Sequence, residues 1–239
     1  MKLFLTLFFF VIKISVDDST FLLDKNFELT KLSENAYLIK SSSSGNGVLD
    51  CNHLLIVDSA EMVLVNTPVN DSLTAVLINC IEKKFMKKVT KVIVSHFHDD
   101  SAGGLKETAK RGILSYGLDK TKELLKSEGK NIDIVFTDSM EIVLKTTRIK
   151  LMYFGAGHSR DNIVAWLPSE KILFGGCMLK APSVNYIGNT KDADMKSWSN
   201  TVKKVKARCS DARIIIPGHM EFSDQSIFDH TIQIVQMNN

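Results

Sequence analysis

Residues 89–100 read VTKVIVSHFHDD, and this stretch decides the fold. Its first half, Val89–Val94, is an apolar run that is typical of a buried strand. His96, His98 and Asp100 follow at alternate positions. Because alternate residues of an extended or tightly turned segment point to one side, these three side chains can converge. The stretch therefore predicts a buried strand that carries metal-binding side chains at its end.

Three further potential ligands, His158, Cys177 and His219, each follow glycine in a loop after a predicted strand. Their segments read GAGH at 155–158, FGGC at 174–177 and PGH at 217–219. Glycine suits such loops because backbone close to an ion leaves little room for a Cβ. Imidazole, thiolate and carboxylate together are the donor set expected for zinc. Six ligands exceed one tetrahedral site, so the sequence predicts two ions.

Each of these residues has an ordinary interpretation when it is taken alone. A single His-x-His pair is more often polar structure than a metal site, and an isolated cysteine such as Cys177 is more often a small buried hydrophobe. The recurrence of such residues beside glycine at strand ends favours the metal. His53 and His230 lack this setting, and we expect them in a loop and on a helix surface.

The composition indicates an ordinary globular protein. The chain has 239 residues, with 44% hydrophobic and 24% charged residues and a net charge of +3. This balance excludes intrinsic disorder, and it lacks the excess of basic residues that is typical of a nucleic-acid-binding protein. No linker divides the chain, so residues 20–239 are expected to form one layered α/β domain.

The N-terminus has the pattern of a secretory signal peptide. Lys2 precedes an apolar run over Leu3–Ile12, which is too short for a membrane-spanning helix. Residues 1–19 are therefore predicted to be a leader, with cleavage between Ser15 and Ser19 and a periplasmic destination; the alternative is a buried N-terminal strand. In an oxidising compartment the cysteines could pair, but which of Cys51, Cys80 and Cys209 do so is left open by the sequence.

Hydrophobic periodicity predicts mixed strands and helices. Strands are expected at Phe27–Leu32, Ala36–Lys40, Leu54–Val57, Met62–Val65, Val89–Val94, Ile132–Phe136, Met140–Leu144, Thr147–Phe154, Ile163–Leu167, Ile172–Phe174 and Ile214–Ile216. Helices are expected at Asp71–Lys84, Leu118–Ser127, Asp194–Ala207 and Asp224–Val235.

The ligand pattern resembles the class B metallo-β-lactamases, specifically their first subclass. The His96-x-His98-x-Asp100 motif is followed by His158, Cys177 and His219 at spacings of 60, 19 and 42 residues. The segments GAGHSRDN at 155–162 and ILFGGC at 172–177 support the resemblance, which extends from about Phe27 to Val235.

The resemblance implies a four-layer αββα sandwich that hydrolyses the β-lactam amide of penicillins, cephalosporins and carbapenems and so confers antibiotic resistance. It implies one zinc ion on His96, His98 and His158 and a second on Asp100, Cys177 and His219. A hydroxide bridging the ions would attack the β-lactam carbonyl, and a protein base is not needed because zinc lowers the pKa of bound water to about 7. The expected partner is a small β-lactam, with no nucleic acid, no membrane span and a monomeric chain.

Other site residues follow from the resemblance by position. Lys180 would hold the substrate carboxylate, although most lysines are simply solvated. Asn189 matches the asparagine beside the developing oxyanion, with Asn185 as a competitor. Ser159 and Asp192 would orient metal ligands.

Two features depart from the family pattern. Asn66 stands where the family usually has aspartate, so it can hydrogen-bond but cannot balance charge, which puts the affinity of the second zinc site in question. The predicted hairpin tip at Ser41–Gly47 is short and lacks the aromatic residue that some members use to cover the substrate.

Two other kinds of protein compete with this interpretation. Glyoxalase-type thioesterases and nucleases of the wider superfamily usually have histidine directly after the aspartate and a bridging aspartate at the later position. Here Ser101 follows Asp100, and Cys177 occupies that later position. A non-catalytic zinc-storage protein is the alternative from another class, but six ligands for two ions leave vacancies that a closed structural site would not keep.

Overall fold

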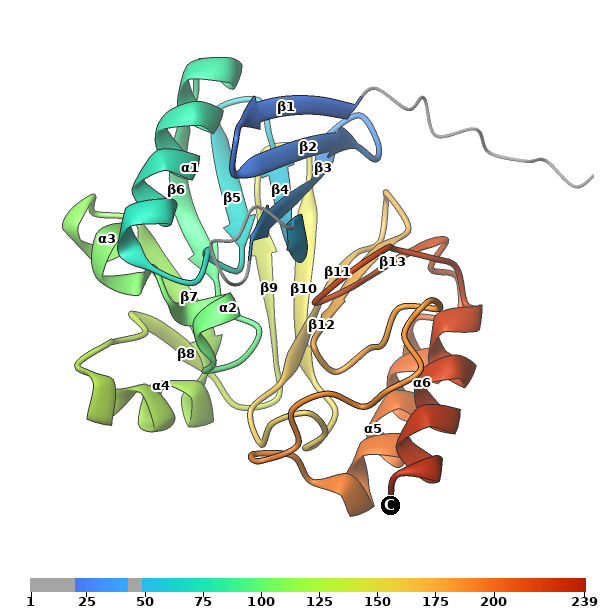
Figure 1. Ribbon diagram of the computed structural model, residues 1–239. Coiled ribbons are helices and arrows are strands. Elements are labelled where there is room, and N and C mark those ends of the chain that lie inside the picture. The colour runs from blue at the N-terminus through green and yellow to red at the C-terminus, as the bar shows by residue number, and fades with distance from the viewer. Residues whose placement is uncertain (1–19, 43–48) are drawn as a thin grey trace, which may run out of the picture.

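The computed structural model describes residues 20–42 and 49–239. The predicted leader, 1–19, and residues 43–48, which include 43–47 of the predicted hairpin tip, lie outside the described residues, whereas Ser41 and Ser42 of that tip lie at the end of a strand. Two β-sheets pack face to face and helices cover both outer faces, which gives four layers (Figure 1). The predicted αββα sandwich is confirmed.

The first sheet holds eight strands in chain order. They are β1 (Thr20–Asp24), β2 (Phe27–Lys31), β3 (Ala36–Ser42), β4 (Leu49–Val57), β5 (Glu61–Val65), β6 (Lys88–Ile93), β7 (Leu114–Leu118) and β8 (Ile134–Phe136). Strands β1 to β5 pair antiparallel, and β5 to β8 pair parallel.

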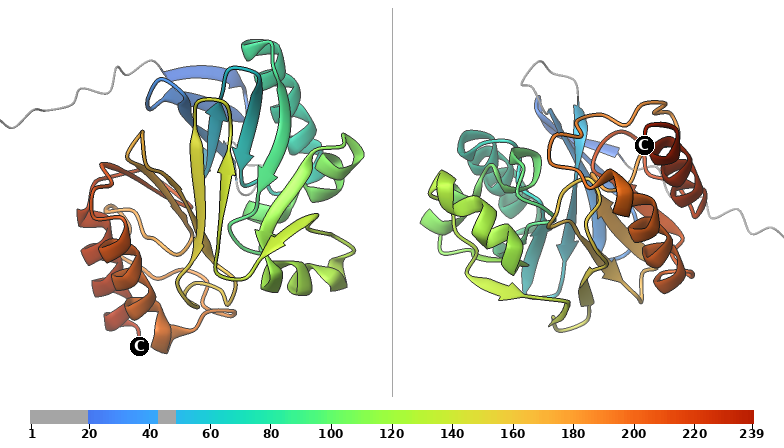
Figure 2. Two further views of the ribbon diagram at one scale, coloured as in Figure 1. Left: turned by 180° about the vertical axis from the view of Figure 1, so that it is seen from behind. Right: turned by 90° about the horizontal axis from the view of Figure 1, so that it is seen from below.

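The second sheet has the order β13-β12-β11-β10-β9. Its strands are β9 (Ser139–Val143), β10 (Arg148–Tyr153), β11 (Ile163–Leu167), β12 (Ile172–Gly176) and β13 (Ile214–Pro217). Only the β12–β13 pair is parallel. The two sheets face each other across the middle of the molecule, which Figure 2 shows from behind and from below.

Helices lie on the outer faces. On the first sheet these are α1 (Asp71–Phe85), α2 (Asp99–Ala102), α3 (Leu105–Lys110), α4 (Asp119–Leu125) and the 3-10 turn η1 (Lys126–Glu128). On the second sheet they are α5 (Met195–Arg208) and α6 (Ser226–Met237). No helix that the structure describes has the length and apolar content needed to span a membrane.

Apolar packing occurs at all three interfaces between the layers. The central core includes Leu54 and Phe174 from the inner faces of the two sheets. A second cluster joins the first sheet to α1 through residues such as Leu77 and Ile81, and a third joins the second sheet to α5 and α6 around Trp198. Burial on both faces explains why central strands such as β5, β11 and β12 read as apolar runs, whereas β9, which is largely exposed, does not.

Most predicted elements are present, but β1 and three elements at or after the metal motif, α2, α3 and β7, were missed, and the segment 118–127 contributes its first residue to β7. The sequences LKETAK at 105–110 and LSYGL at 114–118 are interrupted by polar residues and glycine, so neither shows an apolar run or a clear periodicity. Helix α1 begins as expected, with Asn70 accepting a hydrogen bond from the backbone N of Leu73 at 2.9 Å.

Candidate metal centre

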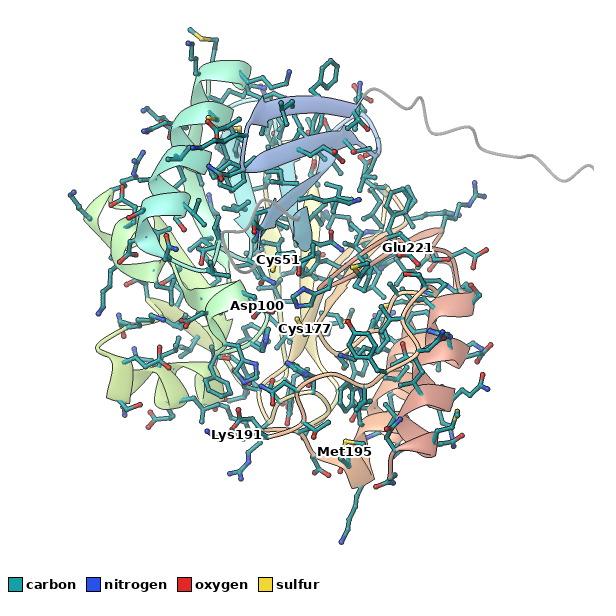
Figure 3. All side chains as sticks on the ribbon, in the orientation of Figure 1. Cys51, Asp100, Cys177, Lys191, Met195 and Glu221 are labelled. Atoms are coloured by element: carbon teal, nitrogen blue, oxygen red, sulfur yellow. The ribbon has the colours of Figure 1, made fainter. Side chains whose placement is uncertain are left out.

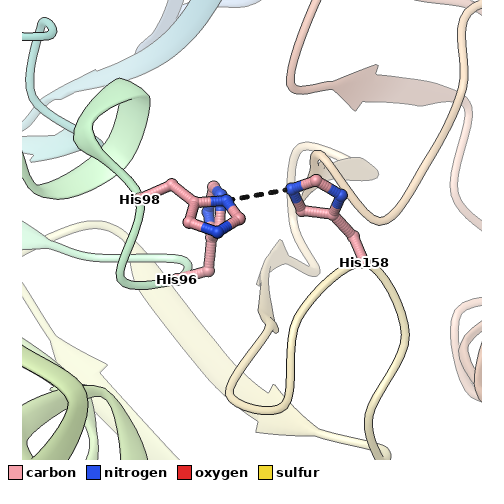
Figure 4. A group of neighbouring side chains, drawn as sticks. All are labelled: His96, His98 and His158. Atoms are coloured by element: carbon pink, nitrogen blue, oxygen red, sulfur yellow. Dashed lines mark hydrogen bonds between the residues drawn. The ribbon is translucent and has the colours of Figure 1, made fainter. Parts of the chain in front are cut away.

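Three histidines from two loops converge at one edge of the sandwich. His96 and His98 lie in the turn after β6, and His158 lies in the loop after β10. Nδ1 of His98 is 3.2 Å from Nε2 of His158, and one ring nitrogen from each of the three lies within 4.8 Å of the others (Figure 4). The two strand ends thus bring His158 next to His96 and His98, although 60 residues separate His98 from His158 in the sequence.

Asp100 lies at the centre of the second group. Its Oδ2 is 3.1 Å from Sγ of Cys177 and 3.0 Å from Nε2 of His219, and its Oδ1 is 3.3 Å from Nε2 of His96. The predicted Asp-Cys-His trio therefore meets at one carboxylate, next to the three histidines. Figure 3 shows Asp100 and Cys177 near the middle of this edge, with Cys51 close by.

The pattern of unsatisfied atoms fits a bound cation. Among the described residues, Nε2 of His96 and Oδ1 of Asp100 are buried and lie 3.3 Å apart, but neither makes a hydrogen bond. An unsatisfied buried polar group costs about 1–3 kcal/mol, so such atoms in a folded protein need an explanation. Both atoms point into the group of donors, and the imidazole, carboxylate and thiol chemistry matches zinc.

Burial and neighbouring charges set the ionisation of these groups. Burial lowers the pKa of His96 and of His158, which keeps both imidazoles neutral and able to offer a lone pair. Burial opposes ionisation of Asp100, but the nearby His96 and His219 outweigh it and hold the pKa of that carboxyl below its usual range. Burial and the Asp100 carboxylate raise the pKa of the Cys177 thiol, so metal binding must displace a thiol proton.

Asn66 supports the turn that carries the first ligands. Its Oδ1 accepts hydrogen bonds from Oγ of Ser101 at 2.6 Å and from the backbone N of Ser95 at 3.0 Å. Its φ of 64° lies in the left-handed region, where asparagine is tolerated better than most residues. Asn66 thus supplies an acceptor beneath the metal motif without adding a charge.

The two residues expected to orient ligands differ in their surroundings. Oδ2 of Asp192 is 3.0 Å from Nε2 of His98, which leaves Nδ1 of that ring facing His158. Ser159 is buried, and its hydroxyl has no hydrogen-bond partner among the described residues. The backbone carbonyl of Ser159 accepts a hydrogen bond from the backbone N of Gly157 at 3.0 Å. Ser159 can therefore help to orient His158 through the loop backbone.

Glycine is required beside Cys177. A Cβ built on Gly218 would lie 2.3 Å from Sγ of Cys177 and 2.7 Å from its backbone N. Side-chain atoms essentially never approach so closely, which explains the glycine before His219. The close approach of the two loops brings Cys177 and His219 to the same carboxylate.

A cavity of about 480 Å³ opens over these groups. Its lining includes His98, Asp100 and Cys177, and also Lys180 and Asn189. Asn185 is not among the lining residues, so the position of Asn189 favours it over its competitor. Oδ1 of Asn189 accepts a hydrogen bond from the backbone N of Lys191 at 3.0 Å.

Lys180 presents its ammonium group to this cavity. Its Nζ lies 5.4 Å from the ring centroid of Trp198, and no carboxylate among the described residues lies within ion-pair distance of it. Burial lowers the pKa of Lys180 because the charged form loses hydration. A ligand carboxylate would replace that hydration.

Sequence reasoning missed Cys51 and misplaced His53. Sγ of Cys51 is 3.7 Å from Nδ1 of His219, and Cys51, Asp100 and His219 form a compact group of metal-binding atoms. The only sequence signal was that three cysteines, Cys51, Cys80 and Cys209, remain once Cys177 is assigned to zinc, so they cannot all pair with one another. All four cysteines lie in the described residues, and none forms a disulfide.

The loop expectation for His53 was wrong. His53 lies in β4, is fully buried and has its Nε2 2.7 Å from Oγ of Ser41. A histidine in a strand rich in leucine and isoleucine gave no sign of its own that it would be buried, because its partner comes from the neighbouring strand. His230 lies on α6 as expected, half-buried, with Nε2 2.9 Å from the carbonyl O of Val184.

His53 is expected to make the fold acid-sensitive. Burial lowers the pKa of His53 to about 4. The unfolded chain, with a histidine pKa near 6.5, then binds more protons between pH 6.5 and pH 4, so stability is complete above about pH 6.5 and falls as the pH drops towards 4. A shift of this size corresponds to roughly 3 kcal/mol.

Urea unfolding of the metal-free chain at pH 7 and at pH 4.5 measures this loss. His53→Gln keeps a polar group near the Nε2 position but cannot take up a proton, so its stability should decline less over the same interval. Any loss of stability from the other titrating groups should be the same in the unaltered chain and in the variant, so the difference between the two declines reports on His53. Equal declines in the chain and the variant would refute the role of His53.

Comparison with known proteins agrees with this geometry. Residues 30–219 match the family described as the Metallo-beta-lactamase superfamily. The chain belongs to this family. It is 38% identical over 213 residues to the metallo-beta-lactamase type 2 of Bacteroides fragilis, and the matched region covers 88% of this chain and 86% of that protein. It is 37% identical over 186 residues to the metallo-beta-lactamase type 2 of Bacillus cereus, and the matched region covers 77% of this chain and 73% of that protein.

A solved metallo-beta-lactamase shares the architecture. The enzyme from Pontibacter korlensis superimposes with a TM-score of 0.84 at 29% identity, over 88% of this chain and 99% of that chain. Together with the two groups of metal-binding side chains, these relatives confirm the predicted resemblance to the first subclass of class B metallo-β-lactamases.

Proposed function

We propose that this metallo-β-lactamase hydrolyses the β-lactam amide bond of antibiotics in a zinc-dependent reaction and thereby confers resistance. One observation carries the proposal. The three-histidine group and the Asp100 group lie side by side beneath one cavity, whose lining includes His98, His158 and Asp100 and also Lys180. The named relatives are metallo-beta-lactamases, which supports the same activity.

The ligand assignments follow from which atoms face one another. His96, His98 and His158 would hold the first ion, and Asp100, Cys177 and His219 the second. The contacts of Asp100 with Cys177 and His219 support the second set, and the 3.2 Å approach of His98 to His158 supports the first. When bound, zinc polarises the amide carbonyl and makes water acidic enough to supply hydroxide near neutral pH.

The chain itself prepares the donors for this chemistry. Asp192 accepts a hydrogen bond from Nε2–H of His98, which leaves Nδ1 of that ring unprotonated, with a lone pair available for a metal ion. The low pKa of Asp100 keeps its carboxylate ionised. Cys177 must lose its proton, and the burial of the thiol means that this happens only when a cation replaces it.

Lys180 and Asn189 would bind the substrate. Lys180 offers a partly desolvated positive charge to the carboxylate that β-lactam substrates carry. Asn189 lies on the same wall of the cavity, where its amide could donate to the carbonyl oxygen as negative charge develops there. Together with the metal ions, these two residues would align the amide bond.

Replacing Lys180 by glutamine should raise KM for a β-lactam about 10- to 100-fold with a smaller effect on kcat. The reason is that a hydrogen bond to a charged group contributes about 1.5–3 kcal/mol, and each 1.4 kcal/mol is tenfold in affinity. Steady-state kinetics measures the change. Lys191→Gln, an exposed lysine outside the cavity lining, is the control and should leave KM as it is. Equal KM values for both variants would remove Lys180 from substrate binding.

Hydrolysis of the chromogenic cephalosporin nitrocefin, with and without a chelator, tests the activity itself. We expect turnover that the chelator abolishes and that added zinc restores. A thioesterase or nuclease of the same superfamily would leave nitrocefin intact and act on a thioester or a nucleic acid. A zinc-storage protein would bind the metal without any turnover, although the open cavity over the ligands argues against that role.

We further propose that residues 1–19 are a cleaved leader and that residues 20–239 form the mature, monomeric domain in the periplasm. The basic start and short apolar run support export. N-terminal sequencing of the protein recovered from a periplasmic fraction would locate the cleavage site. Recovery of the intact N-terminus from the cytoplasm would refute export.

A further inference from the structure

Cys51 is held beside His219 by backbone pairing. The two residues form an antiparallel bridge between the start of β4 and the loop after β13. The neighbouring Asn52 donates its backbone N to the carbonyl of Gly218 at 2.8 Å, and its side-chain Nδ2 to the carbonyl of Pro217 at 2.9 Å. Both segments are therefore fixed, and Cys51 is only 1% exposed.

The two ring nitrogens of His219 have different neighbours. Nε2 is 3.0 Å from Oδ2 of Asp100, whereas Nδ1 is 3.7 Å from Sγ of Cys51, which is within hydrogen-bond range for sulfur. A nitrogen that binds a metal must offer its lone pair, so in a ligating imidazole the other nitrogen carries the proton. For Nε2 to bind an ion, Nδ1–H must therefore point at the sulfur.

We propose that Cys51 is a positioning residue of the metal centre, whose sulfur accepts the Nδ1–H of His219 and so fixes the tautomer and rotation that let Nε2 bind the second zinc ion. The inference rests on the proposed function, because it takes His219 as a ligand. Partners of the second ring nitrogen usually are carboxylates, carbonyls or water, and a thiol in this place is a feature of this chain's own sequence.

The position of Cys51 favours this role over direct ligation. Its sulfur faces the Nδ1 side of the ring, whereas the Asp100 carboxylate, which also contacts Cys177, faces the Nε2 side. Cys51 is also not among the residues that line the cavity. Its effect on the reaction must therefore pass through His219.

Two substitutions separate hydrogen bonding from packing. Cys51→Val keeps the buried volume but cannot accept a hydrogen bond, and Cys51→Ser keeps an acceptor in a smaller side chain. Cys80→Val is the matched control, since Cys80 lies on α1. Should Cys51→Val fail to fold, which thermal unfolding of the metal-free protein would reveal, Cys51→Ala takes its place.

Stepwise competition with a chelator measures the affinity of each zinc ion. In Cys51→Val the second ion should bind about 10- to 100-fold more weakly while the first is unchanged. Cys51→Ser should restore most of the loss, and Cys80→Val should match the unaltered chain. Equal affinities in Cys51→Val and the unaltered chain would overturn the proposal. An unaltered chain that binds fewer than two ions would instead overturn the ligand assignment of the proposed function, and this inference with it.

Spectroscopy provides a readout that a packing defect would not change. Nitrogen NMR of the zinc-loaded chain should show His219 protonated at Nδ1 with a proton that exchanges slowly with solvent, and this proton should exchange faster in zinc-loaded Cys51→Val. With saturating cobalt in place of zinc, so that both sites are filled, the thiolate-to-metal absorption should come from Cys177 alone and survive in Cys51→Val. Loss of part of that absorption would show Cys51 to be a ligand and would refute the positioning role.

Discussion

Replacing Asp100 by asparagine is expected to lower kcat/KM for a β-lactam by at least about 100-fold, because a metal ion contributes several kcal/mol of transition-state stabilisation. The carboxylate contacts Cys177, His219 and His96 at 3.0–3.3 Å. An amide has nearly the same shape, but it carries no charge and offers one acceptor oxygen in place of two. The second ion should therefore be lost while the fold is kept.

Zinc content and steady-state kinetics measured on the same preparation check this expectation. The variant should hold close to one ion, and its activity should rise only at high zinc concentration. Asp229→Asn makes the same chemical change on α6, where the carboxylate is exposed and pairs with Lys206, and it should leave the kinetics unaltered. Full activity with one bound ion in the Asp100 variant would contradict a role for this carboxylate in holding the second.

Removing the metal is expected to abolish turnover and to lower thermal stability. Without an ion, Nε2 of His96 and Oδ1 of Asp100 are buried and unsatisfied. Each ion that binds only the folded chain stabilises it by about 4 kcal/mol when its concentration is a thousandfold above its dissociation constant. At about 2–4 °C per kcal/mol for a chain of this size, the melting temperature should fall by roughly 10 °C or more.

Calorimetry of the zinc-loaded and chelator-treated protein measures the shift. Adding zinc back should restore both the melting temperature and the activity, whereas magnesium, which prefers oxygen ligands, should restore neither. Because the Cys177 thiol must lose its proton, zinc binding should also release protons into an unbuffered solution. Unchanged melting after complete zinc removal would mean that the buried donors are satisfied in some other way.

The proposed metal ligands were predictable because they lie where the sequence pattern is strongest. An apolar run predicts a buried strand, and residues at its end lie at the edge of a sheet. His96, His98 and Asp100 occupy alternate positions within five residues, so their convergence follows from local geometry. Glycine also marks the loops of His158, Cys177 and His219, and at Gly218 a Cβ would lie 2.3 Å from Sγ of Cys177. Helix α3 and strand β7 were missed because their sequences, LKETAK and LSYGL, mix apolar residues with polar ones and glycine and show no clear pattern.

Asn189 and Cys51 illustrate the opposite case. Nothing in the local sequence separates Asn189 from Asn185, and the cavity lining, which includes only Asn189 of the two, favours Asn189. Cys51 lies 168 residues from His219, and a bridge between two strand ends places its sulfur beside the ring. Neither the place of Asn189 in the cavity lining nor the contact of Cys51 with His219 follows from the residues that are nearby in the sequence.

The residue pattern alone predicted buried strands in a layered α/β domain and six side chains able to bind metal, because periodicity, glycine at strand ends and donor chemistry are local properties of the chain. The four-layer sandwich and the class of reaction came from the resemblance of that ligand pattern to the class B metallo-β-lactamases. Only the tertiary structure decided that His53 is buried, that Cys51 faces His219 and that Asp192 faces His98. The partners in these contacts come from separate strands and loops, and their approach is set by the packing of whole layers rather than by any neighbouring residue.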